Sequence, residues 1–447
     1  MGARKDVDLI LKNAHELITS KGPVEGVSGP DLDGLECIQG GALAVDAGRI
    51  VAVGKSATIT EQYSGRQVID CSGCLVSPGL VDPHTHLIYA GSRHEEYQSK
   101  VTGRPSSANL ESGIRYTVAQ TRSADEKTLV TQALKDLDVM AVHGTTTVEA
   151  KTGYGLSMES EKRLMRLTAG LEHAIEVVPT FMGAHVLPSE YDDRRDDYVE
   201  LIVEMLPDVV AEAEYCDVCC DPVGFTPNEC IRIGSVARDL GMRMRVHADQ
   251  TGECSGALTA AKLEAVSADH LDYTTDKGFA AMAAAGTVAT FLPGVTHHMM
   301  EMTPRVVGMD IQDAEKPFMP LVLRRAINAG GCIALSTDYN PGTCPTPSMQ
   351  EVMWLAARLY RLSYAEIWHM CTINAAKALD RSHDRGSLEA GKRADIVVWS
   401  VPEHGMVINR FGVNLVDTVI INGQVVARQG RAVENALRNP SDSGGGR

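Results

Sequence analysis

Eight short β-prone segments, separated by helical stretches, dominate the middle of this 447-residue chain. They are apolar or rich in β-branched residues, and they read CLVSPGLVD, GTTTVEAK, IEVVPTFMG, YCDVCC, MRMRVHA, AVSADH, TVATFLPG and CIALSTD. Amphipathic stretches such as MESEKRLMRLTAGLEHA and FMPLVLRRAINAG fall between them. Eight strands that alternate with helices predict an α/β fold, a closed parallel (β/α)8 barrel of the TIM type. An open doubly wound sheet would also alternate strands and helices, but the recurrence of ligand-type residues at strand ends disfavours it.

Both ends of the chain show short alternating strands instead. Residues 1–75 contain VDLILKNAHEL and GALAVDAGRIVAVG, and residues 386–435 contain ADIVVWSV and TVIINGQVVARQG. Neither end has enough strands to bury a face alone, so we expect them to join into one small β-sandwich domain. Residues 76–385 then form the barrel, and residues 436–447 are expected to be a disordered tail.

The composition narrows the class of protein. Hydrophobic residues make up 44% of the chain, which is enough for a large core, and the formal net charge is −16. This charge disfavours a nucleic-acid or membrane partner, and an anionic substrate would need a locally placed arginine. The sequence shows no secretory leader and no apolar run of the roughly 18 residues that span a membrane, and it contains eleven cysteines. These features predict reduced thiols and a cytoplasmic location.

Five metal-ligand residues stand at the ends of predicted strands. In HTH, His84 and His86 point to the same side of an extended segment, because strand side chains alternate. His247, His270 and Asp338 each end a further β-prone segment. The carboxyl ends of barrel strands form one face, where active sites are built. Imidazole and carboxylate groups suit a borderline metal such as zinc, so the sequence predicts a metal centre on this face.

This order of ligands resembles the amidohydrolase superfamily. The segments HTHLIYAGSR, EAKTGYGL, MGAHVLP, HADQ, SADHL, LPG and TDYNPGTCP are similar to those of the imidazolonepropionase family within it. The resemblance extends over residues 75–395 and implies an enzyme that hydrolyses a carbon–nitrogen bond in a cyclic amide. The reaction it implies is the opening of 4-imidazolone-5-propanoate to N-formimidoyl-L-glutamate, a step of histidine degradation.

The resemblance also implies roles for individual residues. One zinc or iron ion per chain would be held by His84, His86, His247 and Asp338. The substrate would be lined by Arg93, Tyr154, His185, Gln250, Asn340, Gly342 and Thr343. The catalytic set would be Asp338, His270, His185 and Gln250.

The chemistry expected of such a site gives these residues separate tasks. A metal of this kind lowers the pKa of water to about 7, and the hydroxide attacks the ring carbonyl. Asp338 could carry the proton to the leaving nitrogen, and the metal or His185 could stabilise the oxyanion. Gln250 cannot carry a proton, so we assign it to ring recognition and make His270 the second proton carrier. Arg93 suits the propanoate carboxylate, unless it pairs with a neighbouring glutamate.

Lys151 raises the question of how many metal ions bind. Some amidohydrolases bridge two metals with a carboxylated lysine. Here Lys151 follows the second predicted strand, while the fourth ends in Cys219-Cys220-Asp221, so a one-metal site is favoured.

Two segments depart from the family pattern. The 103–114 loop, GRPSSANLESGI, is short and lacks an expected tyrosine, and His297 and His298 follow LPG where an aromatic residue is usual. Together with Arg104, they predict an altered pocket mouth, which leaves open a hydantoin- or thiohydantoin-type propanoate as substrate.

Two further classes of protein fit the sequence less well. A deaminase is disfavoured, because Gln250 stands where those enzymes usually carry a glutamate. A non-catalytic metal-bearing scaffold is disfavoured, because no ligand is missing. Barrels with such a sandwich often dimerise, so we expect a homodimer.

Overall fold

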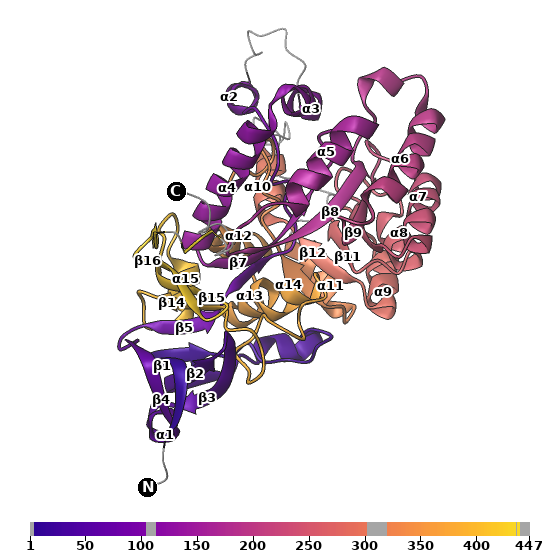
Figure 1. The fold of residues 1–447 in the computed structure, drawn as a ribbon. Helices are drawn as coiled ribbons and strands as arrows, with labels where there is room; N and C mark the ends of the chain where they lie inside the picture. Colours follow the sequence, from indigo (N-terminus) through magenta and orange to yellow (C-terminus); the bar gives the residue numbers. More distant parts are fainter. Residues whose placement is uncertain (1–3, 104–112, 302–319, 435, 439–447) are drawn as a thin grey trace, which may run out of the picture.

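The computed structural model describes residues 4–103, 113–301, 320–434 and 436–438. Eight parallel strands form one sheet in sequence order, with helices around it, which confirms the predicted (β/α)8 barrel (Figure 1). Its strands are β6 (Leu80–Asp82), β7 (Thr145–Lys151), β8 (Glu176–Ala184), β9 (Tyr215–Cys220), β10 (Arg243–Ala248), β11 (Ser267–His270), β12 (Val288–Phe291) and β13 (Ile333–Leu335). Every residue of β7 and β9 is buried, as expected for strands covered on both faces.

The first and last strands meet just beyond their carboxyl ends. Thr85 and Tyr339 form a parallel bridge there. The Asp338 N–H donates to the carbonyl oxygen of His84 at 3.0 Å, and the His86 N–H donates to that of Tyr339 at 2.9 Å. We call this contact the seam, because it joins the segment after β6 to the segment after β13 and closes the barrel.

Helices cover the barrel and its two ends. They are α2 (His94–Thr102), α3 (Ile114–Ser123), α4 (Glu126–Val142), α5 (Met158–Ala169), η2 (Ser189–Tyr191), α6 (Arg195–Val209), α7 (Pro227–Asp239), α8 (Gly256–Lys262), α9 (Asp276–Ala285), α10 (Pro293–Glu301), α11 (Pro320–Asn328), α12 (Met349–Tyr360), α13 (Tyr364–Cys371) and α14 (Ile373–Lys377). The start of α5 illustrates the local cause, since the Ser157 hydroxyl accepts the Ser160 N–H and caps the helix.

Both chain ends form the second sheet, as predicted (Figure 1). Within the described residues it has nine strands in the order β17-β16-β15-β14-β5-β1-β2-β3, with β4 paired to β1. The elements are β1 (Lys5–Ile18), η1 (Gly29–Asp33), β2 (Cys37–Asp46), β3 (Arg49–Lys55), α1 (Ser56–Gln62), β4 (Tyr63–Asp70), β5 (Leu75–Pro78), β14 (Ile396–Trp399), α15 (His404–Asn409), β15 (Val416–Ile421), β16 (Gln424–Arg428) and β17 (Arg431–Ala432).

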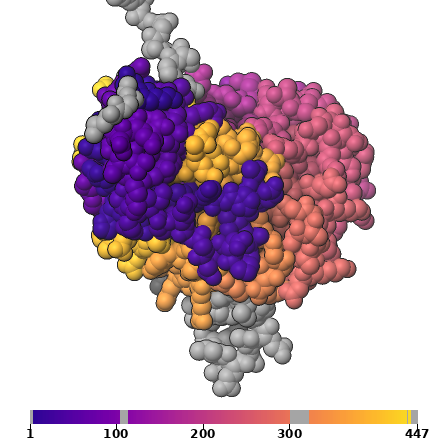
Figure 2. Space-filling model, turned by 90° about the horizontal axis from the view of Figure 1, so that it is seen from below, coloured from indigo at the N-terminus to yellow at the C-terminus, as the bar shows by residue number. Residues whose placement is uncertain are grey.

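The two ends are joined through β5 and β14, which pair antiparallel from Leu75 with Trp399 to Pro78 with Ile396. Side chains of both ends share one core, which includes Leu9, Leu43 and Ile396. Seen from below, the indigo N-terminal segments lie beside the orange and yellow C-terminal ones (Figure 2). The sandwich is therefore built from one continuous sheet that encloses its own core.

One predicted strand is wrong in its extent. CLVSPGLVD is not a single barrel strand, since its first half is β5 of the chain-end sheet and its second half is β6 of the barrel. Pro78 has no N–H to continue a ladder, and Gly79 follows it where a Cβ would come within 2.3 Å of Thr146 Oγ1. The chain therefore changes sheets at Pro78-Gly79.

The predicted tail lies outside the described residues from position 439 onward. In the part of the chain that the structure describes, no helix is long and apolar enough to cross a membrane.

Candidate active site

Five predicted ligand residues converge at the carboxyl end of the barrel. Donor atoms of His84, His86 and His247 lie within 4.8 Å of one another, and so do those of His84, His270 and Asp338. All five side chains are buried. The structure thus brings together residues that are far apart in the sequence, as the strand-end pattern indicated.

Two carboxylates orient the histidine rings. His84 Nδ1 lies 2.7 Å from Asp269 Oδ2, and His247 Nδ1 lies 3.1 Å from Asp217 Oδ1. A carboxylate at Nδ1 favours the tautomer that leaves Nε2 as the free lone pair. Among the described residues, Nε2 of His84 and of His247 has no hydrogen-bond partner. Two buried nitrogen atoms therefore face the centre of the cluster unsatisfied.

The protonation states of the buried histidines suit the binding of a metal cation. Burial lowers the pKa of His84, of His86 and of His270 well below the ordinary histidine value, so these rings are neutral. Neutral imidazole is the form that binds metals. Asp338 Oδ1 lies 3.5 Å from His84 Nε2 and 3.6 Å from His86 Nε2, and it lacks a hydrogen-bond partner among the described residues. Neutral imidazoles gathered beside a carboxylate fit a divalent metal ion.

A buried layer of charge lies directly beneath these ligands. Lys151 Nζ lies 2.7 Å from Glu149 Oε1 and 2.8 Å from Asp217 Oδ2, and Arg245 Nη2 lies 3.2 Å from Asp269 Oδ2. All five side chains are fully buried. Burial alone raises the pKa of Asp217, but His247 and Lys151 lower it well below the ordinary value. Lys151 is therefore ion-paired with carboxylates that support the ligands.

Sequence reasoning missed four members of this layer, Glu149, Asp217, Arg245 and Asp269. A usable signal was a charged residue at an inner position of an otherwise apolar strand, as in YCDVCC and SADH. Such a residue is rarely buried unless it is paired.

His185 and His270 flank the ligand cluster. The His185 ring stacks on that of His86 with centroids 4.7 Å apart, and its Nδ1 lies 3.0 Å from the carbonyl oxygen of Gly153. Burial lowers the pKa of His185 to about 3. His270 Nε2 lies 4.0 Å from Asp338 Oδ2. His270 and Asp338 both have left-handed backbone angles, with φ of 78° and 50°, which non-glycine residues adopt mainly where function requires it.

Tyr154 lies on the catalytic face, in the loop that follows β7. Its side chain is buried, and its ring centroid lies 5.4 Å from that of His86 and 5.5 Å from that of His185. The tyrosine therefore belongs to the same wall as the two histidines.

Arg93 pairs with a neighbouring glutamate and also contacts the 340–343 loop. Its Nε and Nη2 donate to Glu96 at 2.9 and 2.8 Å, which is the pairing weighed against a substrate role. Its Nη1 packs against Gly342, where a Cβ atom would come within 1.9 Å. Burial alone raises the pKa of Glu96, but its contacts with Arg93 and Lys100 lower it to about 2. Arg93 is thus held by Glu96 with one nitrogen against the 340–343 loop.

The Asn340 side chain is engaged within its own loop. Its Nδ2 donates to the carbonyl oxygen of Asp338 at 2.7 Å, and its Oδ1 accepts the N–H groups of Gly342 and Thr343 at 2.8 Å. The predicted substrate contact is therefore, in this structure, the residue that shapes the loop after Asp338.

The remaining predicted residues lie on segments that follow barrel strands or outside the described residues. Gln250 is half-buried in the loop after β10, three residues beyond His247. His298 of α10 stacks on Tyr97 of α2 with ring centroids 5.8 Å apart, and His297 precedes it on α10. Arg104 and most of the 103–114 loop lie outside the described residues.

Comparison with known proteins identifies the family. The model of the Amidohydrolase family matches residues 75–426, and that of an imidazolonepropionase-like composite domain of bacteria matches residues 41–63. An imidazolonepropionase of Alkaliphilus metalliredigens is 39% identical, over 96% of this chain and 100% of its own length. That of Thermoanaerobacter pseudethanolicus is 40% identical, over 93% of this chain and 97% of its own.

A solved structure extends the comparison at the level of the fold. An adenosine deaminase from Xanthomonas campestris with bound zinc superposes with a TM-score of 0.65 at 17% identity, covering 97% of this chain and 95% of that one. The class defined by fold and site is thus a barrel hydrolase with a metal-ion site. The chain belongs to the imidazolonepropionase family of the amidohydrolases. It is accordingly an enzyme that hydrolyses carbon–nitrogen bonds in small cyclic amides.

Proposed function

We propose that this enzyme opens 4-imidazolone-5-propanoate by hydrolysis to N-formimidoyl-L-glutamate, a step of histidine degradation. The observation that carries the proposal is the 37–40% identity, over nearly the full chain, to proteins named imidazolonepropionase. The buried cluster of histidines beside Asp338 supplies the kind of site that such a hydrolysis requires.

We assign one zinc or iron ion per chain to His84, His86, His247 and Asp338. The support is the buried nitrogen and oxygen atoms of these residues that lack a hydrogen-bond partner, together with the neutral state of the His84 and His86 rings. The ion supplies a Lewis acid and lowers the pKa of water to about 7. The ion pairs of Lys151 with Glu149 and Asp217 support the one-metal assignment, because a lysine engaged in this way is not a bridging ligand.

We assign proton transfer to Asp338 and His270, in the cluster of ligand residues. Asp338 is placed to take a proton from water and pass it to the leaving ring nitrogen. His270 approaches the other carboxylate oxygen of Asp338, at 4.0 Å, and is the second proton carrier. His185 donates its Nδ1 proton to the Gly153 carbonyl, so its Nε2 is an acceptor in the neutral ring. Its contribution to the oxyanion therefore requires protonation at Nε2 during the reaction.

The propanoate carboxylate is assigned to Arg93. The net charge of −16 makes a local cation necessary, and a guanidinium binds carboxylates through parallel N–H groups. Glu96 already occupies Nε and Nη2, so the substrate would bind Arg93 through Nη1, which lies at the 340–343 loop. Tyr154, Gln250 and Thr343 complete the wall that we assign to the substrate, with Asn340 and Gly342 shaping it.

The first test is turnover of 4-imidazolone-5-propanoate by metal-replete protein, followed as loss of the ultraviolet absorbance of the ring. We expect rapid loss that chelation and Asp338→Asn both abolish. Asp395→Asn removes another buried carboxylate, next to β14, and should retain turnover as the matched control. No loss with one ion bound would refute the assignment and direct attention to hydantoin-type propanoates. Ammonia release from an aminopurine would instead indicate a deaminase.

We also propose a homodimer, which sedimentation would show as a mass twice that of the chain. A monomeric mass at micromolar concentration would refute it.

A further inference from the structure

The loop between β7 and α5, which carries Tyr154, is held by charged side chains on both sides. We call residues 152–157 the Tyr154 loop. On one side Glu161 Oε1 accepts the backbone N–H groups of Gly153, Gly155 and Leu156 at 3.2, 2.7 and 2.8 Å. On the other side Arg122 donates to the carbonyl oxygens of Gly155 and Leu156, from Nε at 2.6 Å and from Nη2 at 3.0 Å. Five backbone groups of one short loop are thus bound by two side chains.

The backbone of this loop needs such support. Gly153 has φ of 107°, and Leu156 has φ of 49°, a left-handed angle that is unfavourable for a leucine. Residues in such conformations persist only when their surroundings hold them. Glu161, which binds the loop from α5, is fully buried, and burial raises its pKa. A buried carboxylate is retained here because it satisfies backbone N–H groups that would otherwise be unpaired.

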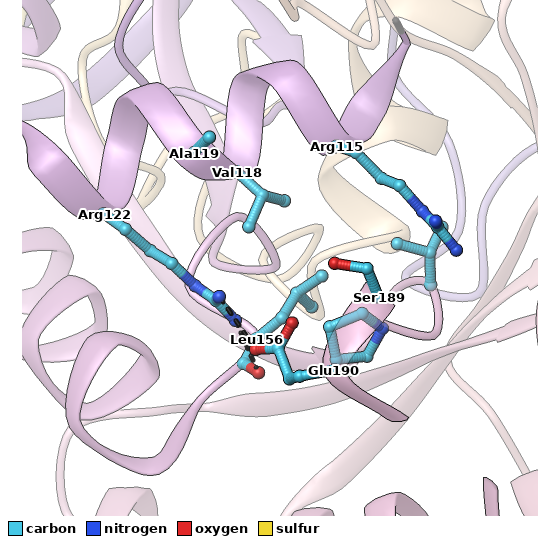
Figure 3. A pocket seen from close by; sticks show the side chains of 9 residues that line it. Arg115, Val118, Ala119, Arg122, Leu156, Ser189 and Glu190 are labelled. Carbon is cyan, nitrogen blue, oxygen red and sulfur yellow. Dashed lines mark hydrogen bonds and ion pairs between the residues drawn. The ribbon is translucent and has the colours of Figure 1, made fainter. Parts of the chain in front are cut away.

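Arg122 also reaches the loop that follows β8. Its Nη1 lies 2.8 Å from Glu190 Oε1, in η2, five residues after His185. Figure 3 shows Arg122 on α3 pointing toward Leu156 and Glu190 across a small hollow. The hollow lies between α3 and both loops, so the polar contacts of Arg122 act there beside the apolar contacts of Val118 and Leu156.

The loop that Arg122 and Glu161 hold is in turn connected to His185 and Tyr154, two residues of the proposed substrate wall. The Gly153 carbonyl accepts from His185 Nδ1 at 3.0 Å, so the position of the loop sets the tautomer and orientation of His185. A Cβ atom on Gly153 would come within 2.9 Å of the same Nδ1, which shows how closely the loop and the ring approach. Tyr154, the next residue, has its ring 5.5 Å from that of His185.

We infer that Arg122 and Glu161 are positioning residues, which fix the Tyr154 loop and so set where Tyr154 and His185 meet the substrate. The inference rests on the proposed function, because it assigns Tyr154 and His185 to substrate binding and transition-state stabilisation. Neither Arg122 nor Glu161 contacts the reacting groups directly. Their effect passes through the loop backbone and, for Arg122, through Glu190.

The test is a double-mutant cycle on turnover of 4-imidazolone-5-propanoate. Arg122→Met is expected to lower kcat/KM by about 10-fold to 100-fold, because displacements near 1 Å at a reacting centre have effects of this order. In a Tyr154→Phe background the same change should cost clearly less than in the wild type, since residues that act as a unit are not additive, and the remaining cost is the part that passes through His185. Arg122→Lys, which retains one donor group, should recover part of the loss. Glu161→Gln should lower kcat/KM in the same way.

A matched control separates positioning from stability. Arg381 lies at the opposite end of the barrel and donates to Glu176 at 3.0 Å and Glu214 at 2.8 Å. Arg381→Met should lower the melting temperature and leave kcat/KM within about 2-fold, because the end of a barrel remote from the catalytic face serves stability. Metal content should stay equal to wild type in every variant.

The outcomes distinguish the inference from the function on which it rests. Equal losses from Arg122→Met in the wild-type and Tyr154→Phe backgrounds would overturn the inference, and so would a loss in Arg381→Met as large as in Arg122→Met. Unchanged turnover in both Arg122→Met and Glu161→Gln would also overturn it while leaving the proposed function intact. No turnover by the wild-type enzyme would instead refute the proposed function.

Discussion

Replacing Lys151 with methionine removes the one cation that, among the described residues, lies between Glu149 and Asp217. The methionine side chain is unbranched like that of lysine and one atom shorter, and it leaves two carboxylates in a site that water does not reach. Breaking one partner of a buried ion pair costs about 3–5 kcal/mol, and here the lower end applies, because Arg245 Nε remains 3.7 Å from Glu149 Oε1 and His247 Nδ1 remains 3.1 Å from Asp217 Oδ1. We therefore expect the free energy of unfolding of Lys151→Met to fall by about that amount.

An exposed ion pair with the same nitrogen–oxygen distance supplies the control. Lys162 Nζ lies 2.8 Å from Asp208 Oδ2, the same distance as Lys151 from Asp217, but both side chains are about half exposed. Exposed pairs contribute about 0.2–1 kcal/mol. Lys162→Met should therefore change stability by less than about 1 kcal/mol, and burial alone accounts for the difference between the two variants.

The assay is urea unfolding of metal-free protein, followed by titration with zinc. Lys151→Met should also weaken metal binding by about 10-fold to 100-fold, since Asp217 would no longer be held against His247. The reasoning is refuted if Lys151→Met and Lys162→Met unfold with equal free energies. Two ions per wild-type chain and one per Lys151→Met chain would refute the one-metal assignment, because Lys151 would then be a ligand.

Three further predictions concern other parts of the molecule. Gly342→Ala should raise KM at least about 10-fold, because its Cβ atom would displace Arg93 Nη1, 1.9 Å away; an unchanged KM would contradict the carboxylate assignment. Asp136→Asn should raise the free energy of unfolding by about 1–2 kcal/mol at pH 8, because burial raises the pKa of Asp136 to about 6. Between about pH 4 and 6 the folded state holds a proton that the unfolded state releases, so this gain should vanish below about pH 4 in urea titrations; a gain independent of pH would contradict it. Chelation should lower the melting temperature of the wild type more than that of His247→Asn, a difference that calorimetry measures.

The barrel and the ligand cluster could be predicted because both follow from local patterns. Each ligand ends a β-prone segment, and the carboxyl ends of parallel strands share one face regardless of the helices between them. His84, His86, His247 and Asp338 could therefore be placed together from the sequence, and Tyr154 could be placed on the same face.

The partners beneath the ligands depend on register between strands, which no local pattern reports. Asp217 pairs with Arg245 across β9 and β10, and Asp269 pairs with His247 across β10 and β11. These alignments bring Asp217 and Asp269 against the rings of His247 and His84. The change of sheet at Pro78 was missed for a related reason, since apolar residues on either side make β5 and β6 look like one strand.

A metal ion bound at the seam would help to hold the first and last barrel strands together. His84 and His86 follow the first strand and Asp338 follows the last, so an ion held by all three would tie together positions roughly 250 residues apart. Because the separated ligands of the unfolded chain would release the ion, such a link would stabilise the folded barrel by the free energy of metal binding. Metal-free protein should accordingly open first at this joint, with the amide protons of His86 and Asp338 exchanging with solvent before those of the central strands.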